Sequence, residues 1–318
     1  MKTMVTGCAG FIGFHLSKYL LSRGDSVVGF DNLNSLTYDN KIKFDRLKIL
    51  EDYEKFDFTR GDLRSQSDLD PVFDNHFDTV CHLAANAGVR NSIDFPVEYV
   101  ASNVLGFTQI IEHCKRCEID NFVYASSSSV YGINNARPSN ESMGLRQPAS
   151  LYAATKIANE LIAFSYNHLF GMKTTGLRFF TVYGPWGRPD MALLIFTRNI
   201  LDEVPIQVFD RGNMFRDFTY VDDIVCGIAK CIDNPSECEI FNVDNGRPEN
   251  LMDFVQLIED CCGKKAKIEL SPMQPGDIKG SHADIAHINK VHGYKPTTDI
   301  SIGIPKTIEW IKEYYDYD

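Results

Sequence analysis

Three polar residues in the middle of the sequence have the types and the spacing to move a proton on and off an alcohol. Tyr152 and Lys156 are four positions apart in a segment of helical character, so their side chains share one face. A phenol titrates near pH ~10 in water, and a neighbouring ammonium group favours its ionised form. Ser127 can hydrogen-bond the same substrate oxygen and share its proton. These three residues are therefore the candidate catalytic set for removing a proton from an alcohol while a hydride leaves for another acceptor.

The segments around these residues give the pattern its weight, because a Tyr-x-x-x-Lys spacing also arises by chance and serine runs also occur in solvated turns. Ser127 ends the apolar run 122–125, which is typical of a buried strand. Helices near 96–117 and 151–169 are expected to flank this strand along the chain, and Gly171 is suited to end the second helix. Such a strand and helix would hold the three side chains together.

A glycine-rich turn follows directly on the first predicted strand and opens a helix. Gly7, Gly10 and Gly13 allow a tight turn in which the backbone approaches a pyrophosphate at the helix amino terminus. Asp31 ends the next apolar run, where a carboxylate accepts hydrogen bonds from ribose hydroxyls and repels a 2′-phosphate. The pattern favours NAD over NADP, and the alternative role for Asp31 is to cap a turn.

Further apolar runs alternate with helical segments and predict parallel βαβ units. The third run ends at Asp62, a plausible adenine partner, and the fourth runs into Ala84 and Ala85, against which a cofactor could lie. We expect cofactor contacts from Gly7, Gly10, Phe11, Ile12, Gly13, Asp31, Asn32, Asp62, Leu63, Leu83, Ala84, Ala85, Tyr152 and Lys156.

The second half of the chain loses this regular alternation after a sixth predicted strand over 174–182. We expect an α/β protein with a Rossmann-type doubly wound parallel sheet of about seven strands and a smaller α/β substrate-binding domain. The expected domains are 1–180, with returning elements near 220–245, and 181–318.

Several arginines could recognise an anionic ligand in this acidic chain. Arg211 and Arg216 lie beside aromatic residues and could clamp a diphosphate, or could belong to a surface ion-pair cluster. Arg90 follows the fourth predicted strand and could point into the cleft, or could equally be a surface charge.

Composition excludes several classes of protein. The chain has 318 residues and 44% hydrophobic side chains, enough for a large core, and its net charge of −11 disfavours binding to nucleic acid or to an anionic membrane. There is no secretory pattern and no apolar run near the ~20 residues that span a membrane, so we expect a cytoplasmic protein. The nine cysteines are scattered and odd in number, which argues against a disulfide framework, and we expect no metal site.

The order of the motifs resembles the extended short-chain dehydrogenase/reductase superfamily over essentially the full length. The motifs are TGCAGFIG, GFDN, GDL, HLAA, SSSSVYG, YAATK, LRFFTVYGP and FRDFTYVDD. Within the superfamily, residues 87–90, 177–192 and 273–277 are similar to bacterial UDP-glucuronate 4-epimerases. The resemblance implies a tightly held NAD and inversion at C4 of a UDP-sugar, most simply UDP-glucuronate to UDP-galacturonate, through a 4-keto intermediate.

The resemblance also implies roles for individual residues. Ser127, Tyr152 and Lys156 would be the catalysts, and Arg216 and Asp277 would contact the UDP moiety. The residues expected near the sugar carboxylate are Arg90, Ser128, Ser129, Thr181 and Arg188. Such enzymes are usually homodimers, here through the helices near 96–117 and 151–169.

Departures from related enzymes keep alternatives open. Ser128 and Ser129 stand where sugar dehydratases and UDP-glucuronate decarboxylases carry an acid, which makes those reactions the weaker alternatives. Gln274 replaces an arginine of the galactose enzymes, and the small Ser281 leaves room for a bulkier sugar. The remaining alternatives are an epimerase acting on UDP-N-acetylglucosamine or UDP-galactose, and a non-enzymatic NAD-binding sensor.

Overall fold

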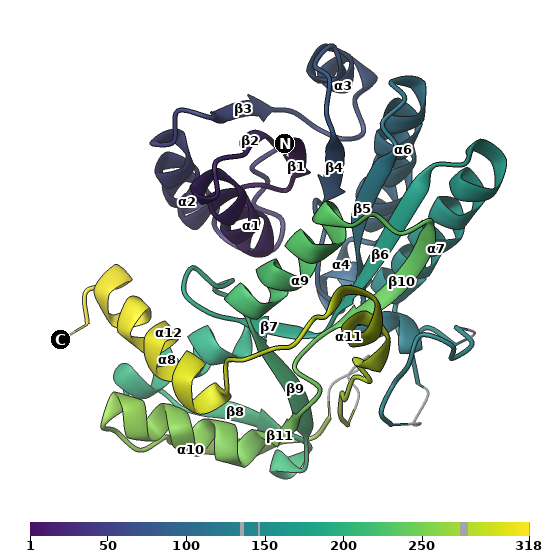
Figure 1. The fold of residues 1–318 in the computed structure, drawn as a ribbon. Helices are drawn as coiled ribbons and strands as arrows, with labels where there is room; N and C mark the ends of the chain where they lie inside the picture. Colours follow the sequence, from purple (N-terminus) through teal and green to yellow (C-terminus); the bar gives the residue numbers. More distant parts are fainter. Residues whose placement is uncertain (134–136, 146, 274–278, 318) are drawn as a thin grey trace.

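A sheet of seven parallel strands forms the centre of the computed structural model (Figure 1), which confirms the predicted α/β fold class. The structure describes residues 1–133, 137–145, 147–273 and 279–317. In spatial order the strands are β10 (Cys238–Val243), β6 (Lys173–Phe179), β5 (Asn121–Ser127), β4 (Thr79–His82), β1 (Lys2–Thr6), β2 (Ser26–Asp31) and β3 (Phe56–Arg60). The order reverses between β1 and β4, and ligands bind at such a switch point in open α/β sheets.

Helices cover both faces of this sheet, and each layer has its own apolar core. One face carries α1 (Phe11–Ser22), α2 (Lys41–Glu51), α9 (Val221–Asp233) and α11 (Ala286–His292). The other face carries α3 (Gln66–Phe73), α6 (Gly106–Arg116) and α7 (Leu151–Phe170). Both β10 and α9 come from the second half of the chain, so the large sheet is not built from a single continuous segment.

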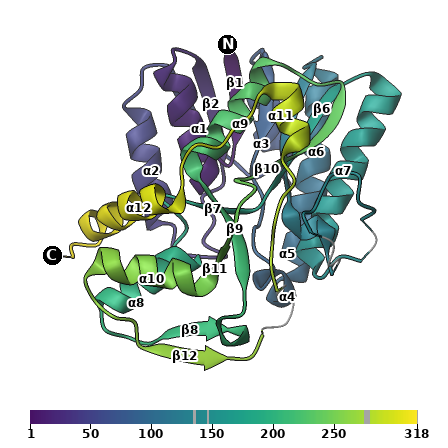
Figure 2. The same ribbon diagram turned by 60° about the horizontal axis from the view of Figure 1, so that its bottom comes forward.

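A smaller group of elements lies below the carboxyl edge of the large sheet (Figure 2). It contains a three-stranded sheet of β7 (Thr181–Tyr183), β9 (Phe215–Tyr220) and β11 (Pro248–Asn250), and a pair of β8 (Ile206–Phe209) and β12 (Ile268–Ser271). Three helices pack on these strands around a third apolar core: α8 (Ala192–Leu201), α10 (Leu251–Cys262) and α12 (Ile300–Tyr314). The division of the chain into domains at residue 180 stays a prediction.

Two predicted elements differ in their details. The helix expected over 96–117 is divided into α5 (Pro96–Val100), a π-helical turn (Ala101–Leu105) and α6, and it is preceded by the short α4 (Asn91–Asp94). The strand expected over 174–182 is interrupted at Phe180, because β7 leaves the large sheet to pair with β9. Within the described residues, no helix combines the length and the apolar character needed to cross a bilayer.

Candidate active site

Ser127 lies at the carboxyl end of β5, where the strand turns into a short 3-10 helix (Ser128–Tyr131). Its hydroxyl oxygen accepts a hydrogen bond from the Ser129 backbone N–H at 3.2 Å and so caps that helix. The side chain is only 8% exposed. The strand end and the cap therefore fix the direction in which this hydroxyl points.

Tyr152 and Lys156 come from the first two turns of α7. Ser150 caps this helix by accepting a hydrogen bond from the Ala153 backbone N–H at 3.1 Å. The Tyr152 ring packs edge-on against Tyr99, with 6.3 Å between ring centroids. The Lys156 ammonium donates to the Ala125 carbonyl of β5 at 2.8 Å, which ties α7 to the strand that carries the serine.

The electrostatic surroundings of the tyrosine differ from the sequence-based expectation. Burial raises the pKa of the Tyr152 phenol, whereas a hydrogen bond with Ser127 and the charge of Arg188 lower this pKa. We expected Lys156 to supply such a charge, and its role stays a prediction; its ammonium donates to a backbone carbonyl, and Arg188 is the cation that lowers the pKa of Tyr152 here. Burial lowers the pKa of Lys156 to about 8, and the charge of Glu160 opposes this shift.

Glu160 belongs to a buried ion pair directly behind Lys156. Arg178 donates to both carboxylate oxygens of Glu160 at 2.8 Å, and the Ser126 hydroxyl donates to Oε1 at 2.5 Å. The two charged side chains are 3% and 5% exposed. Sequence reasoning missed this pair, because no motif links a helix residue to a residue of the next strand.

The glycine-rich turn between β1 and α1 has no room for a side chain at its glycines. A Cβ on Gly13 would lie 2.1 Å from the Gly7 carbonyl oxygen, and a Cβ on Gly7 would lie 2.8 Å from the Ala84 nitrogen. The backbones of the turn and of the segment after β4 are therefore in direct contact. This cradle at the amino terminus of α1 fits the pyrophosphate of a dinucleotide.

The two predicted acidic residues have different surroundings. Asp31 is buried and accepts hydrogen bonds from the backbone N–H groups of Ala9 at 3.2 Å and Leu33 at 2.8 Å, and burial raises its pKa. Each oxygen keeps a further lone pair for a ribose hydroxyl. The Asp62 carboxylate is paired with Arg64 at 2.8 Å, which lowers its pKa to about 2.

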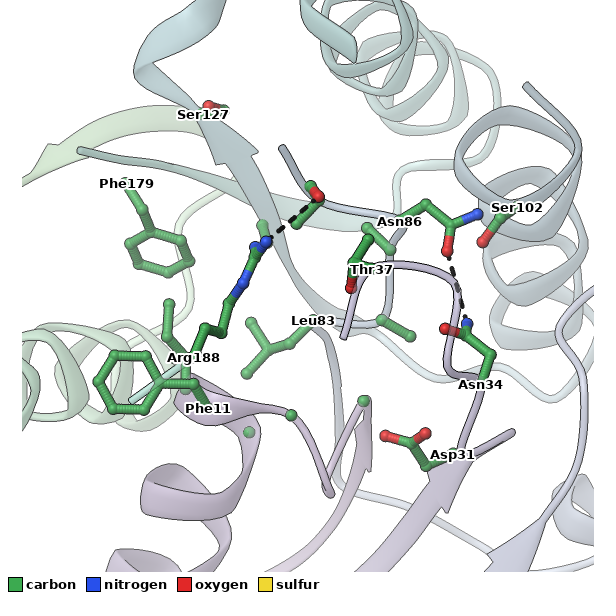
Figure 3. Close-up of a pocket in the computed structure, with 18 of the residues that line it drawn as sticks. Phe11, Asp31, Asn34, Thr37, Leu83, Asn86, Ser102, Ser127, Phe179 and Arg188 are labelled. Carbon is green, nitrogen blue, oxygen red and sulfur yellow. Dashed lines mark hydrogen bonds between the residues drawn. The ribbon is translucent and has the colours of Figure 1, made fainter. Parts of the chain in front are cut away.

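A cavity of about 250 Å³ lies along the carboxyl edge of the sheet, with Asp31 and Ser127 toward opposite ends and Arg188 between them (Figure 3). All the residues predicted to contact the cofactor line this cavity. The cavity is also lined by Asn34, Thr37, Tyr38, Lys43, Asn86 and Ser102. Sequence reasoning missed these six because they lie outside the short motifs.

A second cavity of about 830 Å³ lies between the large sheet and the smaller group of elements. Its lining includes the predicted substrate residues Arg90, Ser128, Ser129, Thr181, Arg188 and Arg216, together with Ser281. Asp277 and Gln274 lie outside the described residues. The Arg90 guanidinium lies 5.5 Å from the Phe209 ring centre, whereas Arg211 is exposed. The aromatic residues noted beside the arginines, Phe209 and Phe218, also line this cavity, whereas sequence reasoning gave Phe180 no role in it.

The two cavities meet at the candidate catalytic residues. Ser127, Tyr152 and Arg188 line both of them. A ligand in the first cavity and a ligand in the second can therefore approach each other beside the Tyr152 phenol. This arrangement suits proton removal from an alcohol in one cavity while a hydride passes to an acceptor in the other.

Comparisons with known proteins agree with this geometry. Residues 3–244 match a family model described as the NAD dependent epimerase/dehydratase family. The chain is 44% identical to "Protein CapI" of Staphylococcus aureus over 99% of both chains, and 44% identical to "UDP-glucuronate 4-epimerase 4" of Arabidopsis thaliana over 100% of this chain and 77% of that protein. The crystal structure of UDP-glucuronic acid 4-epimerase from Bacillus cereus, in complex with UDP-glucuronic acid and NAD, superposes with a TM-score of 0.93 at 34% identity, covering 99% of this chain and 100% of the other.

Proposed function

Because the chain belongs to the NAD-dependent epimerase/dehydratase family, we propose that it is an isomerase that inverts C4 of UDP-glucuronate to give UDP-galacturonate. The observation that carries the proposal is the meeting of the two cavities at Ser127, Tyr152 and Arg188. The glycine cradle and Asp31 suit NAD, which supplies a hydride acceptor and donor when bound.

The proton steps fall to residues of this chain. The Tyr152 phenolate takes the proton of the C4 hydroxyl, and Ser127 shares it through the hydrogen bond between the two side chains. Lys156 holds α7 against β5 through the hydrogen bond from its ammonium to the Ala125 carbonyl. After the 4-keto sugar turns over in the cavity, the hydride returns to the opposite face of C4 and Tyr152 returns the proton to the C4 oxygen.

The hydroxyl-rich wall of the second cavity supports a uronate substrate. Ser128, Ser129 and Thr181 offer hydroxyl donors to the sugar carboxylate, and Arg188, which is paired with Asp190 at 2.6 Å, brings a guanidinium to the same cavity. A 4-keto uronate is a β-keto acid, which loses carbon dioxide when its carboxylate bond stands perpendicular to the carbonyl. Hydrogen bonds that hold the carboxylate away from that alignment protect the intermediate. The wall carries serines where the dehydratases and decarboxylases have an acid.

A charged anchor must hold the nucleotide while the sugar turns. Arg216 lines the second cavity, and its Nη1 donates to the carbonyls of Phe215 at 2.9 Å and Lys279 at 3.2 Å. These bonds direct a guanidinium toward the place where a diphosphate would bind. The part of Asp277 in holding UDP stays a prediction.

UDP-N-acetylglucosamine is the second candidate substrate, because Ser281 is small and lines the same cavity. Its hydroxyl already accepts a hydrogen bond from the Asp217 backbone N–H at 3.2 Å. The contribution of Ser281 to a larger sugar is therefore the space that its small side chain leaves in the cavity. The cationic Arg188 and Arg90 favour the uronate over this neutral sugar.

A panel of UDP-sugars without added NAD tests the proposal. We expect NMR of the C4 proton to show conversion of UDP-glucuronate to UDP-galacturonate, and Tyr152→Phe to lower kcat by a factor of about 10² to 10⁴. Tyr166→Phe removes a hydroxyl from the same helix, where it donates to Glu112, and should leave turnover unchanged. Normal turnover in Tyr152→Phe, or conversion of UDP-N-acetylglucosamine alone, would contradict the proposal.

We also propose that the protein is a homodimer through α5, the π-helical turn and α7, which pack side by side. These elements expose large apolar side chains: Val97 is 76% exposed, Leu161 64% and Phe164 61%. A second copy of the same face would bury them symmetrically.

A further inference from the structure

Arg46 is a fully buried arginine on α2 that connects two loops of the candidate active site. Its Nη1 donates to the Ala9 carbonyl of the glycine-rich turn at 2.9 Å. Its Nη2 donates to the carbonyls of Trp186 at 2.5 Å and Gly187 at 3.3 Å. Among the described residues its guanidinium forms no ion pair. A buried charge is costly, so its bonds to two loops call for an explanation beyond packing.

The loop 184–187 presents its backbone carbonyls inward to these donors. The Gly184 carbonyl accepts from the Gly187 backbone N–H at 3.1 Å, and the Pro185 carbonyl bonds to His15 Nε2 at 2.9 Å. Burial lowers the pKa of His15 to about 4, so its neutral ring donates through Nε2–H. The backbone carbonyls of the loop are therefore held by residues of α1 and α2, whereas the Trp186 ring packs on Trp310 and Tyr314 of α12.

Arg188 comes directly after this loop, and its side chain lines both cavities. Its guanidinium is paired with Asp190 at 2.6 Å, reaches the Ala87 carbonyl at 3.5 Å and lowers the pKa of Tyr152. A shift of the backbone at 186–187 would move this side chain relative to Tyr152. The glycine-rich turn and Arg188 are thus connected through one guanidinium.

We propose that Arg46 is a positioning residue that couples the first cavity (the dinucleotide cavity, beside Asp31) to the second (the sugar cavity, beside Thr181) by holding the 184–187 loop against the glycine-rich turn. The inference rests on the proposed function for the identity of the two ligands. Any ligand that orders the glycine-rich turn also orders Arg46, and through it Arg188. By linkage, a ligand in one cavity then strengthens binding in the other.

A double-mutant cycle tests whether Arg46 acts through Arg188. All proteins carry Tyr152→Phe to prevent turnover, and UDP-glucuronate is titrated calorimetrically into the NAD-loaded protein. We expect Arg46→Met to weaken UDP-glucuronate about tenfold when Arg188 is present and less than about twofold in an Arg188→Met background. Lys48→Met, which removes an exposed charge from the same helix, should have no effect in either background. Equal losses in both backgrounds would overturn the proposal.

The tryptophans provide a readout that needs no substrate. The sequence has two, Trp186 and Trp310, and their ring centroids are 5.3 Å apart. We expect Arg46→Met to shift their fluorescence emission to longer wavelength because Trp186 becomes more exposed, and Lys48→Met to leave it unchanged. An unchanged spectrum in Arg46→Met would refute the role in holding the loop.

Two further outcomes separate this inference from the proposed function. If the Tyr152→Phe reference binds NAD but no UDP-glucuronate, the proposed function fails, whereas the fluorescence test still decides the role of Arg46. If Arg46→Met does not fold, Arg46→Lys keeps the buried charge but cannot reach both loops. The same non-additivity with Arg188→Met is then expected, and additivity would overturn the proposal.

Discussion

Replacing Glu160 with glutamine should change both the stability of the protein and the pH dependence of its activity. The substitution removes the charge that faces Arg178, and the new amide NH2 group meets the donors of Ser126 or Arg178. Removing one partner of a buried ion pair costs about 3 to 5 kcal/mol. With an unfolding entropy of about 2.1 cal/mol/K per residue, this loss lowers the Tm of a 318-residue chain by about 4 to 8 °C.

The effect on pH dependence follows from Lys156. Its ammonium has a pKa of about 8, and Glu160 raises this value against the effect of burial. If the charged form is needed, kcat/KM of the native enzyme falls as pH rises through about 8. Without the carboxylate the pKa of Lys156 drops further, so the alkaline decline moves to lower pH. The activity that Glu160→Gln loses at pH 7.5 should then return in part at pH 6.5.

Glu112→Gln is the matched control for this prediction. Glu112 pairs with Lys115 at 2.7 Å and is 34% exposed, so its loss should cost about 0 to 1 kcal/mol and leave the pH profile unchanged. Calorimetry measures the Tm, and initial rates from pH 6 to 9 measure the alkaline limb. The reasoning is wrong if both substitutions lower the Tm equally, or if the limb of Glu160→Gln stays where the native enzyme has it.

Three further predictions concern the cofactor, the product and the assembly. Gly13→Ala should lose bound NAD, because the Cβ of the alanine would lie 2.1 Å from the Gly7 carbonyl oxygen. Absorbance of the extract from denatured protein measures the bound NAD, and retained NAD would contradict the tight cradle. Thr181→Val keeps the size of the side chain but removes one hydroxyl from the sugar cavity. More of the 4-keto uronate should then lose carbon dioxide, so chromatography should show a larger fraction of UDP-pentose in the product. An unchanged fraction would contradict the role of Thr181 in protecting the intermediate. Phe164→Glu should convert a dimer to a monomer in sedimentation experiments, whereas Ile302→Glu, on exposed apolar surface elsewhere, should not.

Local motifs explain most of what the sequence could predict. The glycine-rich turn, Asp31 and the Tyr152/Lys156 pair each combine a residue type with a short spacing, and a short spacing fixes geometry once the element is known. The break at Phe180 was not predictable in this way, because it depends on β7 pairing with a strand far along the chain.

Contacts between distant segments explain the rest. Arg46 and Trp186 meet across 140 positions, and Glu160 meets Arg178 through the packing of a helix on the sheet. Neither arginine belongs to a pattern that indicates its partner. For the same reason Arg188 was predicted to lie beside the sugar carboxylate but not beside the Tyr152 phenol. In the structure the charge of Arg188 lowers the pKa of that phenol.

The late position of β10 in the chain bears on how the protein is made. β10 covers the outer edge of β6, and α9 covers the apolar face of α1, although both are synthesised well after their neighbours. A nascent chain that has emerged only through β6 therefore exposes an unpaired strand edge and an uncovered helix face, both of which promote aggregation. The large sheet and its covering helices are therefore complete only once residues 221–243 have been synthesised, so the first half of the chain depends on the second for its last contacts.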